Sequence, residues 1–164
     1  MTISKHSIAA RLLALSLGSI ALMGAAAPAQ TAEMHAAVVP GDAVKWGPAP
    51  PSLPPGAQAA VLFGHPGKPG PFVLRLKFPG GFIVPPHRHS KDELLTIISG
   101  NFAAAAGEKV DREAARPLPA GSFVHLPAGM PHYALAATDT VVQINGMGPF
   151  DITYVNAKDD PRKK

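Results

Sequence analysis

The chain has 164 residues, of which 46% are hydrophobic, so its length and composition fit one domain with an adequate core. It contains no cysteine, which excludes a disulfide framework and leaves imidazole and carboxylate groups as the ligands for any metal. The formal net charge is +4, but the basic excess lies at the two ends of the chain, so the body has no surface typical of nucleic-acid binding.

The first 29 residues are expected to be a cleavable signal peptide. A basic start from Lys5 to Arg11 precedes an apolar run over 12–27, and Ala27-Pro28-Ala29 is an A-x-A cleavage site. The apolar run is shorter than the roughly 20 residues of a membrane span, so cleavage before Gln30 is favoured over retention as an anchor. The mature protein is therefore predicted to be periplasmic or secreted, with no stable membrane span.

Residues 30–56 are predicted to form an extended N-terminal arm. The stretch from Trp46 to Gly56 contains five prolines, which remove backbone donors and favour a polyproline conformation. We expect Trp46 to anchor this arm against the outside of the domain or against a second subunit, rather than to contact a substrate.

The following segment, residues 57–157, is predicted to be an all-β domain. Short apolar runs rich in β-branched and aromatic residues alternate with Gly-Pro clusters, a pattern typical of a sandwich or barrel. The expected strands cover 59–63, 72–78, 82–84, 94–98, 122–126, 141–144 and 151–155. The alanine run 103–106 is too short to form a helix alone, and 111–116 is predicted to form a single helical turn. The charged tail, 158–164, is expected to be frayed and solvated.

A candidate metal site lies in the middle of this domain. His87 and His89 are two residues apart, so on a strand both rings project from one face. Glu93 follows across a polar turn and opens the next apolar run, and His132 comes directly after a turn rich in proline and glycine. Two imidazoles and a carboxylate brought together in this way form the 2-His-1-carboxylate type of metal site, with His132 as a fourth ligand.

The spacing of these residues resembles the two motifs of the cupin superfamily. Gly81-x5-His87-x-His89-x3-Glu93-x6-Gly100 matches the first motif, and Gly121-x5-Pro127-x-Gly129-x2-His132 matches the second. The Asn that often closes the second motif is replaced by Ala136. The Trp-Gly-Pro lead-in and Gly146-Met-Gly-Pro149 are similar to those of small exported bacterial single-domain cupins. The resemblance implies a jelly-roll, double-stranded β-barrel with a metal in its mouth, and a possible homodimer.

Further side chains are candidates for the pocket, each with an alternative. Gln143 and Asn145 share one strand face, where they either contact a ligand or orient a metal-bound histidine, or else lie on the surface. His125 is a fifth ligand or an ordinary structural histidine. Arg75 would anchor a substrate carboxylate if it points inward, and would form a surface ion pair otherwise. An apolar lining is expected from Leu95, Ile97, Phe102 and Val141.

These patterns predict a binding site for one divalent metal ion, with Fe, Mn, Zn, Cu and Ni all compatible with the ligands. The sequence has neither a Gly-x-Ser-x-Gly elbow nor a P-loop, so triad acyl transfer and nucleotide binding are not indicated. The first functional hypothesis is a mononuclear non-haem metal oxygenase, or a related metalloenzyme, acting on a small organic molecule. The alternative is a non-catalytic, metal-dependent module that binds or senses a small ligand.

Overall fold

The computed structural model describes residues 36–164, and the expected signal peptide lies outside these described residues. Within this part of the chain, no helix is long and apolar enough to cross a membrane. The only helices described are three short 3-10 turns, η1 (Gly41–Ala43), η2 (Ala157–Asp159) and η3 (Pro161–Lys163). The prediction of an all-β protein is therefore confirmed.

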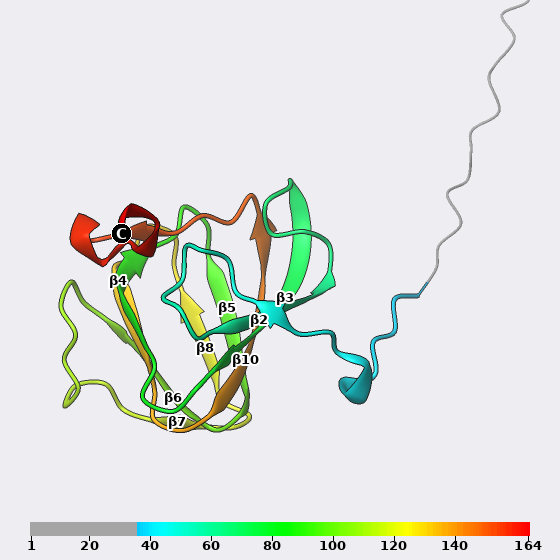
Figure 1. The fold of residues 1–164 in the computed structure, drawn as a ribbon, viewed down its shortest axis with the longest axis horizontal. Helices are drawn as coiled ribbons and strands as arrows, with labels where there is room; N and C mark the ends of the chain where they lie inside the picture. The colour runs from blue at the N-terminus through cyan, green and yellow to red at the C-terminus, as the bar shows by residue number, and fades with distance from the viewer. Residues whose placement is uncertain (1–35) are drawn as a thin grey trace, which may run out of the picture. The chain divides into compact units, whose positions relative to one another are not determined.

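The strands form two antiparallel sheets (Figure 1). The six-stranded sheet has the order β1-β2-β3-β10-β5-β8, and the five-stranded sheet has the order β11-β4-β9-β6-β7. The strands are β1 (Gly47–Pro48), β2 (Gln58–Phe63), β3 (Gly70–Phe78), β4 (Ile83–Arg88), β5 (Glu93–Ser99), β6 (Asn101–Ala106), β7 (Leu118–Pro119), β8 (Phe123–Leu126), β9 (His132–Ala136), β10 (Thr140–Gly148) and β11 (Thr153–Tyr154).

The core lies between the two sheets, as expected for a jelly roll. Along β3 and β10, alternate residues such as Leu74 and Val142 are buried, which is the period-2 pattern of a strand with one face inward. Phe78 of β3 stacks on Phe102 of β6 with ring centroids 5.8 Å apart, so aromatic rings join the two sheets across the interior.

Two central strands of the five-stranded sheet were not predicted from the sequence. β6 consists largely of alanine, which has little intrinsic preference for strands, and β9 starts within the second motif. In the fold, Ala103 pairs with Leu135 and Ala104 with Ala134, so the neighbouring strand imposes the extended conformation. The predicted turn over 111–116 is present, with Ala115 N donating to the carbonyl of Asp111 at 3.2 Å.

The C-terminal tail is folded, which corrects the expectation that it frays. Arg162 Nε donates to Asp160 Oδ1 at 2.7 Å, and Arg162 Nη2 donates both to Asp160 Oδ2 at 2.8 Å and to the carbonyl of Ile152 at 3.1 Å. The Asp160 side chain also accepts from the backbone N–H of Arg162. These bonds tie the tail to the segment leading into β11, because a single arginine satisfies both a carboxylate and a main-chain carbonyl.

Gly100 makes the tight connection between β5 and β6. Its φ is +84°, and an added Cβ would lie 2.3 Å from the carbonyl oxygen of Asp139. Only glycine fits both the left-handed backbone and this close approach. The last glycine of the first motif therefore has a structural role in joining the two sheets.

Candidate metal centre

The four motif side chains converge because the end of β4 meets the starts of β5 and β9. His87 lies near the end of β4 and pairs directly with His132, the first residue of β9. His89 follows directly after β4, and Glu93 is the first residue of β5. All four side chains are buried, with exposed fractions between 2% and 7%. The structure therefore brings together the residues that the motif spacing singled out.

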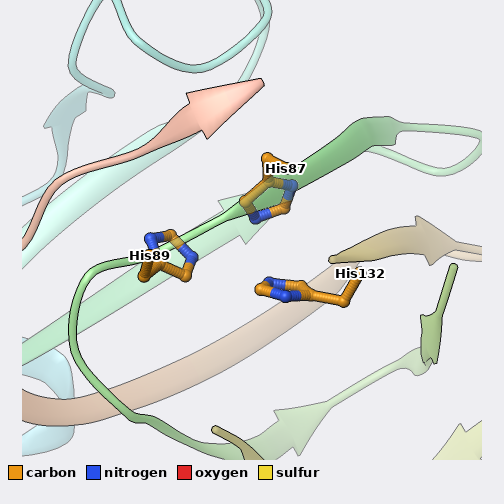
Figure 2. Close-up of side chains that lie close together, drawn as sticks. All are labelled: His87, His89 and His132. Carbon is orange, nitrogen blue, oxygen red and sulfur yellow. The ribbon is translucent and has the colours of Figure 1, made fainter. Parts of the chain in front are cut away.

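The three histidines form a compact cluster able to bind a metal ion. One ring nitrogen of each lies within 4.8 Å of a ring nitrogen of the other two. Figure 2 shows the three rings turned toward one another, from β4, the segment after it and β9. The rings of His87 and His132 are the closest pair, with centroids 4.3 Å apart.

Backbone carbonyls fix how each ring is presented. His87 Nδ1 donates to the carbonyl of Pro85 at 2.7 Å, and His132 Nδ1 donates to that of Met130 at 2.9 Å. His89 Nδ1 donates to the carbonyl of Asp151. Because a carbonyl oxygen only accepts, each Nδ1 carries a proton, and in the neutral ring Nε2 is left as the electron-pair donor.

The Nε2 atoms match the needs of a metal ion. Those of His89 and His132 are fully buried and have no hydrogen-bond partner in the protein. Glu93 Oε2 lies 3.4 Å from both, beyond good hydrogen-bonding geometry. Buried polar atoms without a partner are costly, and a ligated cation satisfies nitrogen lone pairs and a carboxylate together. The donor set of imidazoles and a carboxylate therefore fits a divalent transition metal.

The local electrostatics leave His87 neutral and Glu93 ionised, as a cation requires, but they favour a proton on His89 in the metal-free protein. Burial, then the charges of His132 and His89, lower the pKa of His87 to about 3, so this ring is neutral at physiological pH. Burial alone would raise the pKa of Glu93, but its contacts with His132 and His89 outweigh that effect and lower it to about 2. For His89, burial acts to lower the pKa, while the Glu93 carboxylate raises it above the ordinary value.

His87, His89, Glu93 and His132 line part of a cavity of about 690 Å³, a size typical of small-molecule sites. Leu95 and Phe102 line it as predicted, together with Val142 and Ile144 of β10. Ile97 is buried but does not line the cavity, and Val141 is only half-buried on the opposite face of its strand from Val142.

Part of the cavity wall comes from the arm, which the sequence did not predict. Residues 48–53 line the cavity, whereas Trp46 is half-buried and does not. Tyr154 of β11 holds this segment, since its hydroxyl donates to the carbonyl of Ser52 at 2.7 Å. Another unpredicted contributor is Phe150, whose ring stacks on that of His89 with centroids 4.3 Å apart.

The remaining candidate pocket residues lie on the outer face of the six-stranded sheet, which corrects the inward alternative for each. Arg75 pairs with Gln143 in the β3–β10 register, and its Nε donates to Gln143 Oε1 at 3.0 Å. Gln143 Nε2 in turn donates to Asn145 Oδ1 at 3.3 Å. His125 lies 3.1 Å from Asp92 Oδ2 and is exposed. None of the four lines the cavity, because strand alternation turns their inward neighbours, Leu74 and Val142 among them, toward it.

Comparisons with known proteins agree with this architecture. The profile of the cupin domain family matches residues 74–145. A putative acetylacetone dioxygenase from Methylibium petroleiphilum PM1 superposes with a TM-score of 0.60 and 18% identity, over 79% of this chain and 88% of that one. An RmlC-like cupin protein from Ralstonia eutropha JMP134 has a TM-score of 0.59 and 20% identity, over 77% and 76%.

A more distant enzyme shares the fold as well. The polyketide cyclase RemF from Streptomyces resistomycificus superposes with a TM-score of 0.54 and 15% identity, over 65% of this chain and 76% of that one. No curated protein sequence matches the chain. At these identities the likeness establishes the fold, and any activity has to be argued from the site.

Proposed function

Since the chain belongs to the cupin superfamily, we propose that its buried cluster binds one divalent metal ion through His87, His89 and His132, with Glu93 as the fourth ligand. The observation that carries this proposal is the pair of buried Nε2 atoms, on His89 and His132, that have no hydrogen-bond partner. A folded protein rarely buries such atoms unless something satisfies them. The carboxylate beside them supplies the charge that a divalent cation needs.

The protein around the cluster orients the proposed ligands. The carbonyls of Pro85, Met130 and Asp151 fix the three imidazoles with Nε2 toward the centre. The ring of Phe150 covers one face of His89, which limits rotation of that ligand. A bound metal ion would supply Lewis-acid polarisation of a coordinating oxygen. The apolar cavity would hold the rest of the molecule beside it.

We further propose that the protein acts on a small organic molecule as an oxygenase or a related metalloenzyme. Support comes from the continuity of the metal cluster with a cavity large enough for a substrate. Two fold relatives, the putative acetylacetone dioxygenase and the salicylate 1,2-dioxygenase from Pseudoaminobacter salicylatoxidans, carry oxygenase names, although they share only 18% and 14% identity with this chain.

One observation favours a second candidate, a non-catalytic module that binds or senses a small ligand through the metal. Apart from the four proposed ligands, the only ionisable side chains that line the described cavity are His65 and Asp151, and both are exposed residues. No buried acid or base outside the ligand set therefore faces the cavity centre. A reaction that needs proton transfer would have to use Glu93 itself or these exposed groups.

The metal proposal is tested by measuring metal content and affinity. Purified protein, stripped with chelator, is titrated with Zn(II), Mn(II), Fe(II) and Cu(II), and the bound metal is quantified by elemental analysis. The expected result is one ion per chain, with a large loss of affinity in His89→Ala and in His132→Ala. His65→Ala is the matched control, because His65 lines the same cavity but lies outside the cluster. Equal metal binding in all four proteins would overturn the assignment.

The two functions are separated by oxygen consumption. Protein loaded with each metal is supplied with a panel of small phenols and diketones, and O₂ uptake is recorded with an electrode. Uptake that depends on both metal and compound, and that is absent in His132→Ala, supports the oxygenase. Binding of the same compounds without any turnover supports the sensing module.

A further inference from the structure

The charges around the cavity are distributed unevenly. Among the described residues that line it, none is a lysine or an arginine, and the acidic ones are Glu93 and Asp151. Glu93 belongs to the metal cluster, and Asp151 is exposed. Arg75, the cation nearest in sequence to the lining strand residues Leu74 and Leu76, points to the outer face and is bonded to Gln143. The described cavity lining thus offers no lysine or arginine to an ionised group at the end away from the histidines.

The strand register separates a polar end of the cavity from an apolar end. In the β4–β9 pair, His87 lies opposite His132, while Val84 lies opposite Ala134, further from the metal cluster. In the β6–β9 pair, Phe102 is four residues along the strand from the position that pairs with His132. Phe102 stacks on Phe78, so the end away from the histidines is closed by aromatic rings.

We propose that the natural ligand is an uncharged molecule with an apolar body that fits within the cavity of about 690 Å³ and a single oxygen donor directed at the metal. This proposal rests on the metal site proposed above and adds the class of molecule that the site accepts. The donor, a hydroxyl or carbonyl oxygen, faces the histidines, and the body fills the apolar end. An ionised group on the body is excluded, because it would be buried without a counter-charge.

Small side chains leave the room that the body needs. Ala104 of β6 and Ala134 of β9 are paired directly, and both line the cavity. A leucine at position 104 would project into the space predicted for the ligand. Ala105, the next residue on the same strand, does not line the cavity and is also partly buried. The two positions therefore provide a matched pair for testing occupancy.

The test uses 1-naphthol and 5-hydroxynaphthalene-1-sulfonate as probes. Both present the same hydroxyl, but the second carries a permanent negative charge on the other ring. Binding is measured by isothermal titration calorimetry to the full protein, both zinc-loaded and metal-free, with the zinc content of each sample determined separately. The expected result is saturable binding of 1-naphthol, and binding of the sulfonate at least about tenfold weaker.

The variants locate the binding. Ala104→Leu is expected to weaken 1-naphthol binding at least about tenfold by overfilling the cavity, while Ala105→Leu leaves it unchanged. Absence of 1-naphthol binding, equal affinity for the two probes, or no effect of Ala104→Leu in a folded protein would overturn the proposal. The comparison of the two probes uses only the wild-type protein, so it still tests the proposal if Ala104→Leu fails to fold. If the loaded sample contains no zinc, that result counts against the metal proposal alone. The preference for the uncharged probe arises from the cavity lining, so it is also measured in the metal-free protein.

Discussion

Glu93→Gln is expected to destabilise the metal-free protein, because it removes the carboxylate that lies between the buried rings of His89 and His132. Contacts with His132 and His89 outweigh the effect of burial and lower the pKa of Glu93 from its ordinary 4.5 to about 2. A difference of this size corresponds to about 3 kcal/mol of stabilisation at neutral pH. Gln has the shape and neutrality of the protonated acid, so the variant should lose an amount of that order.

The pH dependence of this effect has a definite sign. The folded pKa lies below the unfolded one, so the contribution of Glu93 is fully present above the ordinary value of 4.5 and is lost as the pH falls through about 2. By pH 3 the advantage of the wild type over the variant should shrink to about 1 kcal/mol. The variant itself cannot titrate at this position.

The assay is urea unfolding of chelator-stripped protein, followed by circular dichroism at pH 7 and at pH 3. Asp92→Asn is the matched control, since Asp92 precedes Glu93 and also contacts a histidine but is 57% exposed. The control should change stability far less. If Glu93→Gln matches the wild type at pH 7, or if the difference between them does not diminish at low pH, the reasoning about this carboxylate is refuted.

Three further changes test other parts of the structure. Tyr154→Phe removes the hydroxyl that donates to the Ser52 carbonyl, and should cost about 1 kcal/mol in urea unfolding and speed proteolysis of the arm. His87→Asn removes a ring whose pKa is lowered to about 3 in the folded protein. Since the unfolded chain takes up this proton at higher pH, the stability advantage of the wild type over the variant should fall as the pH drops from 7 to 5, and a constant difference would contradict the lowered pKa of His87. Gly100→Ala should destabilise by more than about 1 kcal/mol in thermal or urea unfolding, whereas Gly41→Ala, where an added Cβ meets nothing within 4 Å, serves as the neutral control.

Much of the fold could be predicted because the apolar runs with turn residues between them mark strands directly. The run 72–78 alternates buried and more exposed positions, and it lies within β3. The alanine strand β6 could not be predicted in this way, since its conformation comes from pairing with β9 and not from its own side chains. The folded tail was missed for a related reason, because a charged terminus gives no sign of the carbonyl that Arg162 finds at Ile152.

The candidate site shows the same division between local and distant information. The spacing of His87, His89, Glu93 and His132 identified a cluster that the fold brings together. The partner of His89 Nδ1 is a carbonyl 62 residues away, at Asp151, and no local pattern marks it. The side-chain face of Arg75 was likewise ambiguous, because alternation gives two faces but does not say which of them meets the core.

The wall formed by residues 48–53 lies outside the segment that matches the cupin domain profile, 74–145, yet it borders the same cavity as the histidine cluster. Only Pro48, at the end of the two-residue strand β1, belongs to a sheet. Changes in this short segment can therefore reshape the cavity while the hydrogen-bond ladders that close the barrel stay intact. The cavity can therefore change in shape through this segment as well as through strand residues such as Ala104, while the histidine cluster stays the same.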